Sequence, residues 1–243
     1  MELAGKSVVV TGGAVRIGRA LAIRLARAGV NVCLHCNSST KDADATVNVL
    51  RDLGVRATTV SADFSNPVAA ARALLERAVE ELGAVDFLIN SAAIFEPATL
   101  AELTEAGWDR HLGINLKAPV FLCQQFCESL PEGRRGQVIN IADWRGTRPV
   151  PGHLAYTVAK AGLVATTRLL AQELAPHVQV NAIAPGAILP ATGSSVEAFE
   201  ERAESIPLRR TGGPNDIADA VEYLLRSDFV TGEVIHVTGG EQL

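Results

Sequence analysis

Short runs of aliphatic and β-branched residues alternate along the chain with longer stretches whose apolar residues recur at helical spacing. The short runs, predicted as strands, cover 6–10, 30–34, 56–60, 85–90, 137–141, 178–184 and 232–237. The predicted helices cover about 17–28, a stretch ending at 53–54, 67–82, 108–130, 154–174 and 215–225. The strand runs lack polar alternation, which indicates burial on both faces and hence a parallel sheet covered by helices. The order predicts a single doubly wound α/β fold.

No change of composition and no linker divides the 243 residues, so we expect one domain over 1–243. The segment 187–210 has the least regular pattern and follows a predicted strand end. Segments placed in this way often close over ligands. We therefore expect a mobile flap there.

Charge and composition narrow the function. Lys and Arg number 22 against 27 Asp and Glu, a net charge of −5 without a long basic run, which argues against nucleic acid and anionic membranes as partners. Residues 1–6 lack the pattern of a targeting segment, and no apolar run approaches membrane-spanning length, so we expect a cytoplasmic protein. We interpret Cys33, Cys36, Cys123 and Cys127 as buried apolar residues, and we expect no metal site.

Polar residues and glycines gather where the predicted strands end. These positions are Thr11–Gly13, His35–Ser39, Asp63, Asn90–Phe95, Asp143 and Pro185–Gly186. In a doubly wound sheet, ligands bind beyond the carboxyl ends of the strands, where the strand order reverses. The sequence therefore predicts one ligand site along this edge.

The turn after the first strand carries glycines at Gly12, Gly13 and Gly18. Such glycines let the backbone approach a pyrophosphate, whose charge suits the start of a helix. Arg16 stands where a further glycine is expected. The alternative is a plain tight turn with a surface arginine.

The end of the second strand bears on the choice of cofactor. An acid about 20 residues after the glycines would bind the 2′-hydroxyl of NAD, but this chain has His35, Asn37, Ser38 and Ser39. Hydroxyls and an amide, assisted by Arg16, can instead donate hydrogen bonds to a 2′-phosphate. This favours NADP over NAD, the alternative being an ordinary polar turn.

Tyr156 and Lys160 lie one helical turn apart and share a helix face. A nearby ammonium group can lower the pKa of a phenol and make it a useful general acid. Asp143 lies 13 residues before the tyrosine, where a hydroxyl residue would be expected. Such a pair can also be an ordinary helix face with an extended lysine.

Taken in order, these motifs resemble those of the short-chain dehydrogenase/reductase family over essentially the whole chain. The resemblance implies a Rossmann-type domain, a nicotinamide cofactor and a homotetramer. It gives Tyr156 as proton donor, Lys160 as the residue that also binds the nicotinamide ribose, and Asn115 as the holder of a relay water. The expected cofactor-binding residues are Thr11, Gly12, Gly13, Arg16, Ile17, Gly18, His35, Asn37, Ser38, Ser39, Asp63, Phe64, Asn90, Ala92, Ala93, Tyr156, Lys160, Pro185, Gly186 and Ile188.

Within that family the chain most resembles the pteridine reductases. They carry the arginine matched by Arg16, an aspartate matched by Asp143, and a ring-stacking aromatic matched by Phe95. The chain departs from them in three places, where Ser38 replaces a basic residue, Ala93 a serine, and His153 a second active-site tyrosine. The resemblance implies NADPH-dependent reduction of a pteridine, with Arg16, Phe95, Asp143 and Tyr156 contacting the substrate.

Other functions stay open. An ionised aspartate cannot donate a hydrogen bond to a substrate carbonyl, so Asp143 argues against a general reductase of 3-oxoacyl thioesters or sugars without excluding one. Asp143 can also be an ion-pair partner of Arg16, Arg145 or Arg148, and Phe95 can be a core residue. A non-catalytic dinucleotide sensor is a further alternative.

Overall fold

All strands that the structure describes lie in one sheet. The computed structural model describes residues 2–191, 193 and 195–243. Its seven strands are parallel throughout and follow the order β3-β2-β1-β4-β5-β6-β7. Their bounds are Ser7–Val10, Asn31–Cys36, Ala57–Ser61, Phe87–Asn90, Gly136–Ile141, Val178–Pro185 and Val234–Val237 for β1 to β7. The predicted doubly wound α/β fold is confirmed.

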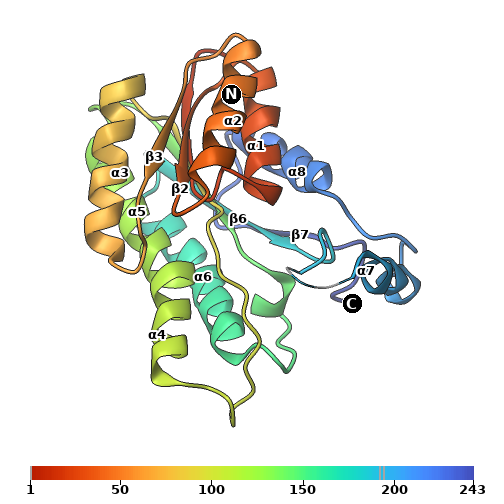
Figure 1. The fold of residues 1–243 in the computed structure, drawn as a ribbon. Coiled ribbons are helices and arrows are strands. Elements are labelled where there is room, and N and C mark those ends of the chain that lie inside the picture. The colour runs from red at the N-terminus through yellow and green to blue at the C-terminus, as the bar shows by residue number, and fades with distance from the viewer. Residues whose placement is uncertain (1, 192, 194) are drawn as a thin grey trace.

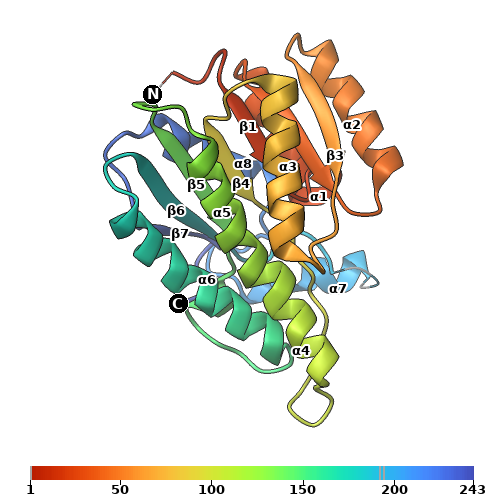
Figure 2. The same ribbon diagram turned by 90° about the vertical axis from the view of Figure 1, so that its left-hand side faces the viewer.

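Helices cover both faces of the sheet (Figures 1 and 2). One face carries α1, α2 and α8, at Arg16–Arg27, Thr40–Asp52 and Pro214–Arg226. The other carries α3, α5 and α6, at Pro67–Leu82, Ala118–Ser129 and Leu154–Glu173. The shorter helical elements are α4 at Glu105–Leu112, α7 at Val196–Glu201, the π-turn η1 at Gly113–Lys117, and two 3₁₀ turns, η2 at Trp144–Gly146 and η3 at Arg202–Ser205.

Successive strand residues enter two different cores. In β1, Val8 and Val10 pack with α1 and α8, whereas Val9 packs with α3 and α5. All three are fully buried, and burying each valine stabilises the fold by about 1.5–3 kcal/mol. This two-sided burial explains why the strand runs show no polar alternation.

The structure differs from the expected elements in a few places. The predicted helix at 108–130 consists of α4, η1 and α5, which run on from one another. We did not predict α7, which buries none of its residues and therefore has no apolar periodicity. Of the cysteines, Cys127 is only half-buried. Residues 192 and 194 of the predicted flap lie outside the described residues, and its mobility stays a prediction.

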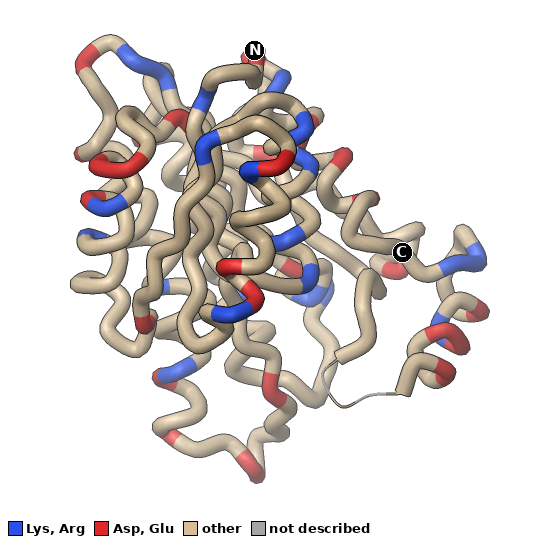
Figure 3. The backbone as a smooth tube through the Cα atoms, turned by 45° about the horizontal axis from the view of Figure 1, so that its top comes forward, with Lys and Arg blue, Asp and Glu red and all other residues tan. Residues whose placement is uncertain are grey.

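The helices that the structure describes include none both long and apolar enough to cross a membrane. Basic and acidic residues are interspersed along the backbone (Figure 3).

Gly18 offers a test of how tightly the first turn is packed. A Cβ there would lie 2.1 Å from the carbonyl oxygen of Gly12, and backbone cannot yield that far without distortion. We expect Gly18→Ala to lower the free energy of unfolding by about 3 kcal/mol, measured by urea denaturation. Gly113→Ala is the matched control, because its φ of −58° is helical and open space surrounds it; we expect it to stabilise the protein by about 0.5–1 kcal/mol. Equal stability of the two variants would contradict this account of the turn.

Candidate active site

The strand order reverses between β1 and β4, and the ends of these strands are tied together. The Thr11 hydroxyl accepts hydrogen bonds from the backbone amides of Ser91 at 2.9 Å and Ala92 at 3.0 Å. Gly12 has a φ of +62°, and a Cβ on it would lie 2.9 Å from the Ala92 Cα. Only glycine allows the first turn to approach the segment after β4 this closely.

A cavity of about 690 Å³ opens beside this contact. The predicted site residues that line it are Gly12, Arg16, Ile17, Gly18, Ala92, Ala93, Phe95, Asp143, Tyr156, Lys160, Pro185, Gly186 and Ile188. The structure thus brings together the first turn, the end of β4, the end of β5, α6 and the segment after β6. The predicted residues outside its lining are Thr11, Gly13, His35, Asn37, Ser38, Ser39, Asp63, Phe64, Asn90 and Asn115.

Arg16 has the backbone conformation of the glycine it replaces. Its φ is +54°, a left-handed conformation that costs a side-chain-bearing residue roughly 1–2 kcal/mol. Its guanidinium donates a hydrogen bond to the carbonyl oxygen of Pro190 at 2.7 Å. Arg16 therefore connects the first turn to the segment after β6, across the cavity mouth.

His35 supports the first turn from inside the fold. Its Nδ1 accepts a hydrogen bond from the Gly12 amide at 3.2 Å, and its Nε2 lies 2.9 Å from the Ala62 carbonyl oxygen. The ring is buried and stacks on Phe64, and this burial lowers the pKa of His35. Both ring nitrogens are engaged, so the His35 ring supports the first turn with Phe64 stacked on it; cofactor contact by His35 and Phe64 stays a prediction.

The polar residues after β2 remain open to solvent. Asn37 and Ser38 are exposed and Ser39 is half-buried, just before α2 begins. The hydroxyls of the two serines form no hydrogen bond within the described part of the chain. Asp63 accepts two hydrogen bonds from Ser65, which lower the pKa of its carboxyl. This edge can therefore offer donors to a phosphate at the start of a helix.

Three of the predicted catalytic groups converge at the far end of the cavity. The Tyr156 hydroxyl donates a hydrogen bond to Asp143 Oδ2 at 2.8 Å. The Lys160 ammonium lies 5.7 Å from the centre of the Tyr156 ring and donates to the Ile141 carbonyl oxygen at 2.6 Å. The phenol, ammonium and carboxylate predicted from the sequence thus share one pocket.

The pKa of Tyr156 shifts opposite to our expectation. Burial and the adjacent Asp143 carboxylate raise the pKa of the phenol well above its usual value. Burial also lowers the pKa of Lys160 to about 8. The lysine therefore does not lower the phenol pKa in the resting site, where Tyr156 holds its proton and directs it to Asp143.

Asn115 is fully engaged by the backbone. Its side-chain oxygen accepts from the Ile94 amide and its side-chain nitrogen donates to the Ile94 carbonyl, both at 2.9 Å. It lies in the π-turn between α4 and α5 and is buried. Its side chain fixes the segment after β4, and its holding of a relay water stays a prediction.

The side chain of Asn90 likewise forms hydrogen bonds within the protein. Its side-chain nitrogen donates to Asn140 at 2.8 Å, and Asn140 donates in turn to Thr167 at 2.9 Å. Asn90 Oδ1 is buried without a partner among the described residues. This chain of polar groups joins β4 and β5 to α6 beneath the catalytic groups.

Phe95 lies at the cavity wall with 39% of its surface exposed, so it is not a core residue. Its ring is stacked against His153, with centroids 4.1 Å apart and an angle of 7° between the planes. It also meets the Tyr156 ring edge-on at 4.7 Å. Phe95, which we predicted to stack on a substrate, thus already stacks on His153 in the resting site.

Two further arginines lie in the cavity wall: Arg145, which the sequence suggested only as an ion-pair partner of Asp143, and Arg202, which it did not suggest. Arg145 lies 3.6 Å from Asp143 and is the ion-pair partner among the three that we considered; Arg148 instead donates to backbone carbonyls of Gln242 and Leu243. Arg202 lines the cavity and pairs with Glu241. Arg145 lies two residues after Asp143 at a strand end, and this position could have placed it in the site. Arg202 lies in the irregular segment 187–210, where no pattern in the sequence indicated its position.

This fold and site are those of an oxidoreductase, and comparison with known proteins gives its family. A family model described as "Enoyl-(Acyl carrier protein) reductase" matches residues 13–242. The chain belongs to the short-chain dehydrogenase/reductase family.

Its relatives differ in their stated activities. The 3-oxoacyl-[acyl-carrier-protein] reductase FabG of Staphylococcus epidermidis is 34% identical over 241 residues, covering 97% of this chain and 98% of the relative. FolM alternative dihydrofolate reductase 1 from Brucella canis, solved with NADP, is 38% identical with a TM-score of 0.95, covering 99% of this chain and 95% of that protein. A blue fluorescent protein from a metagenomic library, solved with NADPH, is 34% identical with a TM-score of 0.92, covering 99% of both chains.

The buried Lys160 predicts a pH dependence of stability. The unfolded lysine keeps its proton up to about pH 10.5 and the folded one loses it near 8, so unfolding takes up protons between these values and stability rises with pH there. Below pH 8 the folded protein bears the cost of a buried ammonium. Lys160→Met removes this contribution.

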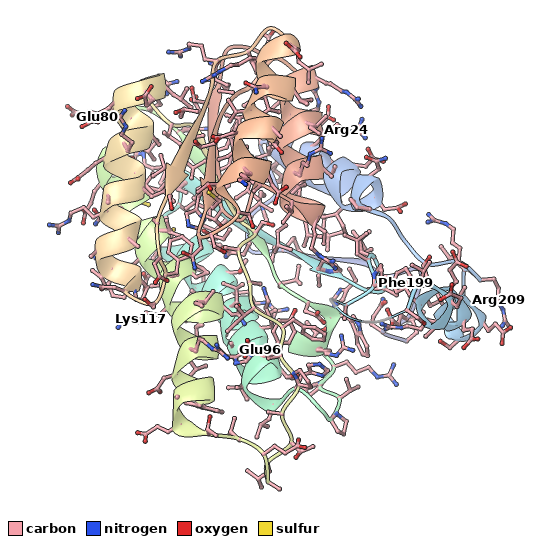
Figure 4. The ribbon with its side chains drawn as sticks, in the orientation of Figure 1. Arg24, Glu80, Glu96, Lys117, Phe199 and Arg209 are labelled. Atoms are coloured by element: carbon pink, nitrogen blue, oxygen red, sulfur yellow. The ribbon has the colours of Figure 1, made fainter. Side chains whose placement is uncertain are left out.

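We therefore compare the free energy of unfolding of Lys160→Met with that of the unaltered protein at two pH values. We expect the variant to be less stable, relative to the unaltered protein, at pH 9.5 than at pH 7. Urea denaturation at both values, without cofactor, measures it. Lys117→Met is the control, because Lys117 is exposed at the junction of η1 and α5 (Figure 4), and its difference should not change with pH. A pH-independent difference for Lys160→Met would contradict the burial of a charged lysine.

Proposed function

We propose that this protein is an NADPH-dependent reductase of flat, electron-poor C=N or C=O rings, with a pteridine as substrate. The observation that carries the proposal is the hydrogen bond from Tyr156 to Asp143 at 2.8 Å, in a cavity that also contains Arg16 and Phe95. A carboxylate beside the proton donor suits a ring that carries N–H groups.

The fit of a dinucleotide is supported by three glycines, Gly12, Gly18 and Gly186, in the cavity wall. Because glycine has no side chain, the backbone at such positions can approach a pyrophosphate closely. Arg16 and the exposed Ser38 support the preference for NADP, as do the NADP and NADPH bound to the similar proteins. When bound, NADPH supplies the hydride.

The protein's own groups would handle the proton. Tyr156 is protonated at neutral pH because burial and Asp143 raise its pKa, so it can deliver a proton to the substrate heteroatom. Lys160, 5.7 Å from the ring, would then stabilise the phenolate that remains. Asp143 would accept a hydrogen bond from the substrate. The phenolate would regain its proton from solvent once the product leaves, and the phenol would then donate to Asp143 again.

A second candidate, reduction of a 3-oxoacyl thioester, is supported by the FabG relative. Tyr156 and Lys160 suffice in principle for a carbonyl substrate. Asp143 weighs against it, because its charge would oppose the negative charge that develops on the carbonyl oxygen. The homotetramer and the cytoplasmic location expected from the sequence remain predictions alongside either function.

The role of Arg16 predicts a change in cofactor preference. Arg16→Gly keeps the left-handed backbone conformation without strain and removes the guanidinium. We expect KM for NADPH to rise about tenfold to a hundredfold and KM for NADH to change little. Arg27→Met, an exposed change at the far end of α1, is the control. An equal loss with both cofactors would contradict a contact between Arg16 and the 2′-phosphate.

The role of Asp143 predicts which substrate is reduced. We expect the unaltered protein to oxidise NADPH with dihydrobiopterin at least about tenfold more efficiently, in kcat/KM, than with an acetoacetyl thioester. Asp143→Ser should reverse or abolish that preference, because serine can donate to a carbonyl. Higher efficiency with the thioester in the unaltered protein would favour the second candidate.

Tyr156→Phe serves as the catalytic control in the same assay. It should abolish turnover of either substrate while NADPH binding, followed by nucleotide fluorescence, persists. NADPH binding without turnover of any pterin, quinone or ketone by the unaltered protein would instead favour the sensor.

A further inference from the structure

Arg145 has an unusual position for an arginine in a cavity wall. Its guanidinium carbon lies 5.1 Å from the centre of the Trp144 ring and 5.5 Å from that of Phe95. Only 17% of the side chain is exposed. Contact between a guanidinium and aromatic faces is attractive, so these rings hold the planar group in place while it faces the cavity.

The donors of this guanidinium are unused. Its Nε is buried without a partner, and its Nη1 lies 3.6 Å from Asp143 Oδ1, too far for a hydrogen bond. Within the described residues, the Arg145 side chain makes no hydrogen bond at all. Buried charged donors without acceptors are costly, and native structures rarely keep them without a functional reason. The cavity therefore contains a preoriented donor group that lacks its acceptor.

The neighbouring carboxylate limits what that acceptor can be. Asp143 Oδ1 accepts from the Arg145 amide at 2.8 Å and Oδ2 accepts from Tyr156. Carboxylate oxygens have further lone pairs, so Asp143 can still accept from a ligand. The two side chains carry opposite charges and present donor and acceptor side by side. The carboxylate of Asp143 would repel a carboxylate ligand. A neutral group that has both a hydrogen-bond acceptor and an N–H donor would avoid this repulsion.

We propose that Arg145 is a specificity-determining residue that donates to the carbonyl oxygen of a cyclic amide edge, while Asp143 accepts from the adjacent N–H. This inference rests on the proposed function and deepens it, because it names the group that the heterocycle must carry. In a ring with an amino group in place of that carbonyl oxygen, the amino N–H groups would face the N–H groups of Arg145. Because neither side can accept a hydrogen bond, such a ring is rejected. A 3-oxoacyl thioester has no N–H beside its reacting carbonyl and lacks this edge.

The test combines a change in the substrate with a change in the protein. Two 7,8-dihydropteridines are compared, one with the 2-amino-4-oxo edge and one with the 2,4-diamino edge, by kcat/KM with saturating NADPH. For the unaltered protein we expect the oxo compound to be preferred about tenfold to a hundredfold. Arg145→Met keeps an unbranched side chain and removes the donors, and we expect it to lower the preference to within about threefold of unity. Coupling of this kind isolates the contact from general damage.

Matched variants separate recognition from packing. Arg145→Lys keeps a charge but loses the planar fork, and we expect an intermediate preference. Arg27→Met, at the far end of α1, should leave the preference unchanged. A merely structural role of Arg145 would lower kcat/KM for both compounds alike and keep their ratio, which would overturn the inference.

The unaltered protein provides an outcome that does not depend on any variant folding. If it reduces both compounds equally well, the inference fails while the proposed function stands. If it reduces neither and reduces the acetoacetyl thioester, the proposed function fails and the inference with it. Retained NADPH binding by Arg145→Met, measured by fluorescence titration, shows that its altered preference comes from a folded protein.

Discussion

The contact between the ends of β1 and β4 is the constraint on which the site depends. One hydroxyl, that of Thr11, satisfies two backbone amides some eighty residues further along the chain. The missing Cβ of Gly12 lets the two strand ends meet at van der Waals distance. Parallel strands whose crossovers leave in opposite directions open a space beyond this meeting point. The cavity therefore follows from topology, and the side chains that enter it decide its chemistry.

Those side chains place several charged groups close together in a largely buried region. Lys160 and Tyr156 come from α6, and Asp143 and Arg145 come from the turn after β5. Burial shifts the pKa of the lysine down and that of the phenol up, so both groups are tuned by the same lack of water. Most polar atoms here have partners within the protein. The guanidinium of Arg145 is an exception, because it forms no hydrogen bond with the described residues and lies 3.6 Å from Asp143.

The sequence was sufficient for the features that local chemistry determines. Unbroken apolar runs predicted the parallel sheet, and the glycines, Tyr156, Lys160 and Asp143 marked the strand ends and helix that form the site. Contacts between distant segments were not predictable in the same way. Nothing local indicates that the ring of His35 supports the first turn or that Phe95 is stacked on His153. The direction of the Tyr156 shift also depends on burial, which no spacing of residues reveals.

The π-turn between α4 and α5 sets a limit on how this protein can change. A π-turn contains one residue more than the corresponding α-helical turn, and one residue rotates the following helix by about 100°. Helix α4 packs against α6, whereas α5 packs against α3. Deleting a single residue from Gly113–Lys117 would straighten the run and turn Leu122 and Phe126, both fully buried, away from the core. The phase relation between the two helices therefore fixes the length of this segment, while the bonds from Asn115 to Ile94 fix one of its side chains.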